Sequence, residues 1–147
     1  MDKRLEHIKS LANPVIEGVG YYLLDALFEN DGEQVIWILV ECEDGPVTLD
    51  KCAALSREIG FVLEAHDLMS DRYRLNVSSP GLERPLTDVR QFQKNVGRKL
   101  RFKMDGQLVE GKLVDFSDEL LTLDLPECRK KVDLESIDDV RVIPSFT

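Results

Sequence analysis

The stretch Tyr73 to Leu86 reads YRLNVSSPGLERPL, and the rest of the chain is organised around it. Apolar and polar side chains alternate over residues 73–78, which predicts a half-buried strand. The strand ends at Ser78-Ser79-Pro80-Gly81, because proline removes a backbone donor and glycine permits a positive φ. Pro85 and Thr87-Asp88 then suit the start of a short helix. The stretch therefore consists of a strand and the tight turn that joins it to a helix.

This turn has two interpretations. It is either a rigid corner whose serine hydroxyls satisfy backbone groups, or a recognition loop that presents polar side chains to a partner. The candidates for contact are Ser78, Ser79, Glu83 and Arg84. The chemistry of these residues is compatible with both interpretations.

Upstream of the turn, the periodicity predicts two helices and two strands. Apolar residues at three- and four-residue steps over 5–16 indicate an amphipathic helix, which Pro14 kinks or shortens. Residues 21–29 form a strand, and Asn30-Asp31-Gly32 is typical of a hairpin. Residues 34–42 are apolar on both faces, so we expect a central strand covered on two sides. Thr48 is a plausible N-cap for a second helix over about 49–65.

With the strand at 73–78 and a short helix over 89–96, the element order is α-β-β-α-β-α. This order predicts two helices on one face of a three-stranded sheet, a two-layer α/β domain spanning residues 1–92. Downstream the sequence indicates only short strands, at 99–104, 108–116, 120–125, 129–134 and 139–143, with Gly111 as a bend or bulge. Five short strands predict a small closed or partly closed barrel over residues 93–147, and hence an α+β protein.

Composition favours a cytoplasmic globular protein without a catalytic centre. The chain has 147 residues, 43% hydrophobic and 32% charged, with no apolar run long enough to span a bilayer and no signal-peptide pattern. The three cysteines form no CxxC pair, and the two histidines lie at no ligand spacing from them. Because phosphate-loop, dinucleotide, zinc-protease and nucleophile-elbow motifs are also missing, we expect no catalytic residues, no metal and no cofactor.

The charge is unevenly distributed along the chain. Its net charge is −9, and residues 1–88 carry 8 basic and 17 acidic side chains, so the excess lies entirely there. Residues 90–103 contain basic side chains and no acidic ones, whereas residues 105–127 are acidic apart from Lys112. Such segregation is either a solvated face or a partner-binding surface. Four residues of the basic strand are candidates for contact with phosphates without base specificity: Arg98, Lys99, Arg101 and Lys103. Trp37 is expected in the core rather than on a base-stacking platform.

The stretch Val77 to Leu86 closely resembles the hallmark VSSPGL(D/E)RPL of the bacterial ribosome maturation factor RimP family. Val47 to Cys52, followed by Ser56, resembles that family's GVTLDDC…S helix start. Two positions depart from the pattern. Ala26-Leu27-Phe28 stands where many relatives carry an acidic residue in the first strand, and Lys51 replaces an aspartate. The layout matches along essentially the whole chain.

The resemblance implies an N-terminal α/β domain followed by an SH3-like (Sm-like) barrel. It also implies a non-enzymatic assembly factor that binds the free small ribosomal subunit (30S) near its central pseudoknot and contacts the basic ribosomal protein numbered twelve. Our hypothesis for the charges is that the acidic domain attracts that basic protein while the basic strand meets rRNA phosphates. We expect a monomer with neither a membrane partner nor a small-molecule substrate.

Two other functions remain as alternatives. A general RNA-binding Sm-like module would bind unrelated RNA with comparable affinity when no ribosomal protein is present. A hydrolase or transferase could use the serine loop, but a base near Ser79 is missing from the sequence pattern.

Overall fold

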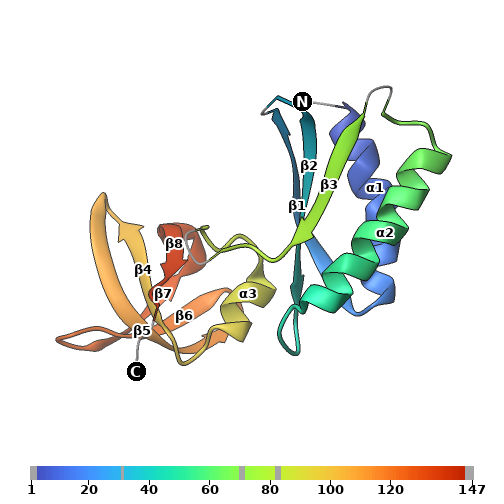
Figure 1. Cartoon of the computed structure of the whole chain (residues 1–147). Coiled ribbons are helices and arrows are strands. Elements are labelled where there is room, and N and C mark those ends of the chain that lie inside the picture. The colour runs from blue at the N-terminus through green and yellow to red at the C-terminus, as the bar shows by residue number, and fades with distance from the viewer. Residues whose placement is uncertain (1–2, 31, 70–71, 82–83, 145–147) are drawn as a thin grey trace. The chain divides into compact units, whose positions relative to one another are not determined.

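The computed structural model describes residues 3–30, 32–69, 72–81 and 84–144. The chain divides into two compact units, Met1–Pro80 and Gly81–Thr147, whose elements are labelled in Figure 1. The sequence predicts a boundary between residues 92 and 93, but the division falls inside the turn of the 73–86 stretch. The reason is packing. Leu86 and Phe92 lie in the hydrophobic core of the second unit, and the Leu86 N–H donates to the Val140 carbonyl at 2.7 Å.

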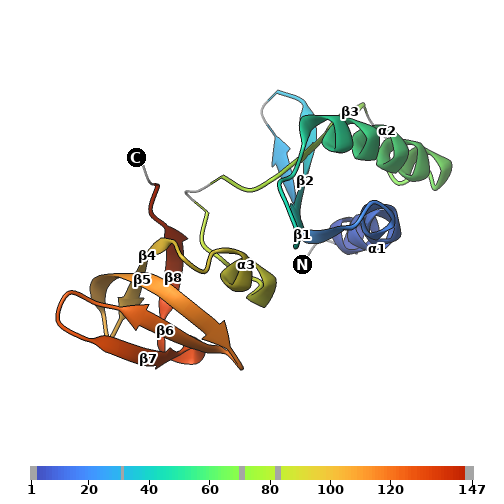
Figure 2. The same ribbon diagram turned by 90° about the horizontal axis from the view of Figure 1, so that it is seen from below.

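The first unit has two layers and the predicted element order up to its third strand, whereas the short helix predicted to end this domain lies in the second unit. It contains α1 (Lys3–Gly18), β1 (Tyr21–Asn30), β2 (Gln34–Cys42), α2 (Leu49–Ala65) and β3 (Tyr73–Ser78). The sheet order is β1-β2-β3, with β1 antiparallel and β3 parallel to the central strand β2. Both helices lie on the same face of this sheet, as Figure 2 shows. Pro14 lies inside α1, and the helix continues past it to Gly18.

The two faces of β2 have different surroundings. Ile36, Ile38 and Val40 are buried and pack in one core with residues of α1 and α2. The alternate residues of β2 point to the opposite face of the sheet. Trp37 is one of them: it is half-buried, it lies outside that core, and its Nε1 donates to a Glu29 carboxylate oxygen at 2.7 Å. The expectation of a core tryptophan is therefore wrong, because strand alternation places its side chain away from the helices.

The start of α2 is fixed by hydrogen bonds from both directions. Thr48 is the N-cap, and its hydroxyl accepts from the Lys51 N–H at 3.2 Å, as predicted. The Thr48 N–H in turn donates to the Tyr21 hydroxyl at 3.0 Å. Further along the helix, the Ser56 hydroxyl donates to the Leu75 carbonyl at 3.3 Å. These contacts join the helix to β1 and to β3, the strand that leads into the turn.

The second unit consists of one short helix and five strands. Its elements are α3 (Val89–Lys94), β4 (Lys99–Met104), β5 (Gln107–Ser117), β6 (Leu120–Asp124), β7 (Arg129–Asp133), the 3-10 turn η1 (Leu134–Ser136) and β8 (Asp138–Val142). All neighbours in the order β7-β6-β5-β4-β8 are antiparallel. The five predicted strands are confirmed. The pairings leave β7 and β8 as the two edges of a curved sheet, so barrel closure is not among the hydrogen bonds of the described residues (Figures 1 and 2).

Two-residue turns set the register of this sheet. Asp105 and Gly106 join β4 to β5 with φ of 53° and 78°, and Asp118 and Glu119 join β5 to β6 with φ of 52° and 62°. Positive φ at both central residues is the turn geometry whose twist matches that of the flanking strands. In the resulting β4–β5 ladder, Lys99 pairs with Lys112 and Leu100 with Gly111.

A capping box holds α3 against the sheet. The Asp88 carboxylate accepts from the Arg90 N–H at 2.9 Å, and the Gln91 side-chain oxygen accepts from the Asp88 and Thr87 N–H groups at 3.1 and 2.8 Å. Gln91 is buried, and Phe92 beside it stacks on Phe116 of β5 with ring centroids 5.4 Å apart. The hydrogen bond from Arg90 lowers the pKa of Asp88, since it favours the charged carboxylate.

We expect Gly111→Ala to destabilise the second unit by about 1–3 kcal/mol, because the added Cβ would overpack its surroundings. That Cβ would lie 2.7 Å from Leu125 Cδ2 and 3.1 Å from the Asp124 carbonyl oxygen. The control is Gly60→Ala inside α2, where the new Cβ would meet only Leu75 at 3.7 Å. This change should stabilise the first unit by about 0.5–1 kcal/mol. Hydrogen exchange of β5 and α2 amides measures both effects, and a stabilising Gly111→Ala would contradict the packing.

We expect Asp88→Ala to cost the second unit about 1 kcal/mol at neutral pH, through loss of the N-cap. Asp88→Asn keeps the acceptor but loses the charge that Arg90 stabilises. Because the folded pKa of Asp88 lies below its ordinary value of 3.8, the carboxylate stabilises the fold above that pH. Its contribution disappears as the pH falls through the folded pKa. In denaturant unfolding, the difference between wild type and Asp88→Asn should shrink as the pH falls below 3.8. A constant difference would contradict the role of the pair.

Candidate functional site

The turn that carries the family hallmark, residues 77–86, connects the two units, and we call it the hallmark turn. Ser78 is the last residue of β3, and Pro80 ends the first unit. Arg84 lies in the second unit, where its N–H donates to the Gly81 carbonyl at 3.1 Å. Glu83 lies outside the described residues. The candidate contact residues of the turn are therefore divided between the two units rather than gathered on one of them.

Both ends of the turn are anchored in hydrophobic cores. Val77 packs against the core of the first unit, and Leu86 packs against the core of the second. Between them, the Ser78 hydroxyl donates to the Ser79 carbonyl at 3.0 Å, as the corner interpretation predicts. Ser79 itself is exposed. The turn thus has a structural role, and partner contact through its polar side chains remains a proposal.

The basic residues of β4 lie on its outer face. Lys99, Arg101 and Lys103 are exposed and alternate with Leu100 and Phe102, which are fully buried. Arg101 is already neutralised, because its guanidinium forms a salt bridge of 3.0 Å with Glu110, its partner in the β4–β5 ladder. The four basic candidates are therefore not equivalent.

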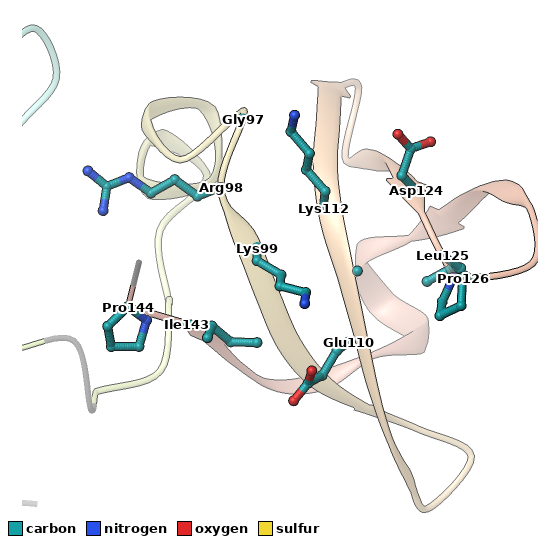
Figure 3. A pocket seen from close by; sticks show the side chains of 11 residues that line it. Gly97, Arg98, Lys99, Glu110, Lys112, Asp124, Leu125, Pro126, Ile143 and Pro144 are labelled. Atoms are coloured by element: carbon teal, nitrogen blue, oxygen red, sulfur yellow. The ribbon is translucent and has the colours of Figure 1, made fainter. Parts of the chain in front are cut away.

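An open groove of about 970 Å³ lies on the second unit. Only two of the four basic candidates line it. Arg98 and Lys99 line it, whereas Arg101 and Lys103 do not. Figure 3 shows Lys99 and Lys112 on neighbouring strands, with Ile143 and Pro144 on one side and Leu125 and Pro126 on the other. The groove thus combines lysines with an apolar flank on each side.

Lys112 is the residue that the charge pattern along the sequence missed. It is the one basic residue in an acidic segment, so its charge seemed isolated. The Asp105-Gly106 turn carries the signal that would have revealed it. A two-residue hairpin loop fixes which residues pair, and this register places Lys112 directly opposite Lys99.

The acidic residues beside the groove have their own partners. Asp124 accepts from Arg129 Nε at 2.7 Å. That hydrogen bond, and then the charges of Arg129 and Lys112, lower the pKa of Asp124 in spite of its partial desolvation. Glu110 is held by Arg101. Neither carboxylate forms a salt bridge with Lys99 or Lys112 in the described part of the chain.

The described residues offer little support for metal binding, for a reactive cysteine or for a membrane-spanning helix. Within the described ranges, no three histidine, cysteine or acidic side chains are grouped so that they could hold a metal ion. His7 and His66 contact each other edge to face, with ring centroids 6.2 Å apart. Burial raises the pKa of the Cys52 thiol, which keeps it protonated and unreactive. None of the described helices combines the length and the apolar character needed to cross a membrane.

Comparison with known protein families identifies the N-terminal part of the chain. The model of the RimP N-terminal domain matches residues 11–83. The match covers most of the first unit, including the helix start at Thr48, and it ends inside the hallmark turn. The chain therefore belongs to the RimP family of ribosome maturation factors.

Proposed function

We propose that this protein binds the free, immature small ribosomal subunit and assists its assembly by docking rather than by catalysis. Its membership of the RimP family, shown by the match over residues 11–83, carries this proposal. The proposal includes contact with the basic ribosomal protein numbered twelve and with adjoining rRNA. It also includes a cytoplasmic location, a monomeric state, no cofactor and an SH3-like closure of the curved second sheet.

The charges of the two units support a division of labour. Residues 1–80 carry 7 basic and 15 acidic side chains, whereas residues 81–147 carry 12 basic and 13 acidic ones. The negative electrostatic field of the first unit attracts a lysine- and arginine-rich protein and repels rRNA. The first unit is therefore the one that suits the basic ribosomal protein, and the nearly neutral second unit suits RNA.

Exposed carboxylates gather where β2 leads into α2. Glu43 and Asp44 lie in the turn, and Asp50 lies in the first turn of the helix. Among the described residues, none of these three carboxylates forms a salt bridge. The nearby Lys51 ammonium instead lies 5.4 Å from the centre of the Tyr21 ring. Lys51 replaces an acidic residue of the family pattern, so we assign the attraction to its neighbours.

Sedimentation tests the proposal. We expect the purified protein to co-sediment with free small subunits, to associate weakly with mature ribosomes, and to bind the isolated basic protein. Affinity for the small subunit should fall about tenfold or more when salt is raised from about 50 to 200 mM, because the binding is electrostatic. Comparable binding to unrelated RNA would instead favour the general RNA-binding alternative.

A charge-neutralising pair of substitutions locates the contact. Glu43→Gln with Asp44→Gln should weaken binding to the isolated basic protein about tenfold. The matched control is Glu58→Gln with Glu64→Gln, which removes the same charge from the exposed surface of α2 and should have a smaller effect. Equal losses for the two pairs would mean that net charge alone matters and that this turn is not the contact.

We expect Arg84→Ala to weaken association with small subunits more than it lowers the melting temperature. The reason is that Val77 and Leu86 anchor the ends of the turn in the two cores, and neither of these contacts is removed by the substitution. Parallel binding and thermal unfolding measurements check this. A loss of stability as large as the loss of affinity, both expressed as free energies, would leave Arg84 with a purely structural role.

A further inference from the structure

The outer faces of β4 and β5 carry a like-charged pair. Lys99 and Lys112 are directly opposite each other in the antiparallel ladder, and both are exposed. Like charges in directly opposed positions destabilise a sheet. In the described residues neither lysine forms a salt bridge or side-chain hydrogen bond. The fold therefore places two ammonium groups without a salt bridge beside each other, and Asp124, which faces Lys112 in the β5–β6 ladder, offsets part of the charge of that lysine alone.

The two carboxylates nearest to the pair form their salt bridges with arginines rather than with the lysines. Glu110 is held by Arg101 at 3.0 Å, and Asp124 is held by Arg129 at 2.7 Å. Arg98 adds a third cation at the rim of the groove, although in Figure 3 its guanidinium extends away from the lysines. The two lysines are thus the centre of the positive charge in the groove.

The position of the groove limits what can occupy it. β4 and β5 are interior strands, each hydrogen-bonded to a neighbour on both sides. A peptide cannot extend the sheet there, because strand addition requires a free edge. The lining residues include no aromatic side chain, so bases have no ring to stack on. The remaining mode of binding is one in which the lysine side chains contact anionic groups along the backbone of a ligand.

We propose that this groove binds the phosphodiester backbone of RNA without sequence preference, through Lys99 and Lys112, with Arg98 at its rim. Lysine ammonium groups contact phosphate oxygens as point charges, which requires no planar partner. Leu125 and Ile143, which flank the lysines, provide apolar surface for the sugars. Arg101 lies outside this site and acts on it by holding Glu110. The groove stands on its own geometry, and only the identity of the RNA as rRNA rests on the proposed function.

The test uses the full chain and a fluorescent twelve-nucleotide polyuridine RNA. We expect Lys99→Gln with Lys112→Gln to weaken binding at least about tenfold. The slope of log affinity against log salt should become shallower by about 1.4, since about 0.7 is lost for each single-strand phosphate contact. The double variant should melt close to wild type, because it removes both the repulsion between the lysines and the attraction of Lys112 to Asp124.

Lys130→Gln with Lys131→Gln is the matched control. It removes the same charge from the exposed edge strand β7, outside the groove. It should weaken RNA binding less than about threefold, through the general field alone. Equal effects of the two pairs, or unchanged RNA binding by the groove variant, would overturn the site. Preferential binding of a polyglutamate peptide that depends on Lys99 and Lys112 would also overturn it, in favour of an acidic protein partner.

The same variants separate this inference from the proposed function. If wild type fails to sediment with small subunits while its RNA binding still depends on Lys99 and Lys112, the ribosomal role fails and the groove stands. If wild type sediments and the groove variant binds RNA normally, the ribosomal role stands and the groove fails.

Discussion

The structure depends on the anchoring of one short connection at both of its ends. On one side, Val77 pairs with Ile38 of β2 and packs in the first core. On the other side, the Leu86 N–H donates to Val140 of β8, and Leu86 packs in the second core. Replacing Val77 or Leu86 by a polar residue would therefore disturb a core. The two apolar ends of the family hallmark therefore have a structural role, whatever its polar side chains contact.

Much of the fold could be predicted from the sequence because the decisive signals are local. Alternation and, for residues 34–42, an apolar run predicted the strands, and the Thr48 and Asp88 caps marked two helix starts. The errors concern contacts between distant residues. Residues 81–92 were assigned to the first domain because they follow its last strand, whereas the partners of Phe92 include Phe116. Trp37 was placed in the core because β2 is apolar on both faces, and composition does not say which face the helices cover.

The same reasoning explains how much of the candidate site was predicted. A run of basic residues named Arg98, Lys99, Arg101 and Lys103 together, because charge along one strand is visible in the sequence. Pairing across strands then divides them: Glu110 neutralises Arg101, and Lys112 joins Lys99. Electrostatic surfaces are set by neighbours across the ladder as much as by neighbours along the chain. The short hairpin at Asp105-Gly106 is the local feature that encodes this long-range result.

Gly111 lies in the wall of the groove and at the closest approach of β5 to Leu125. A larger residue there would both fill the groove and push the neighbouring strand outward. The packing of β5 and the openness of the groove therefore impose the same requirement on one backbone position. Substitutions that retune this surface would therefore have to fall on charged side chains such as Lys99 and Lys112 rather than on Gly111.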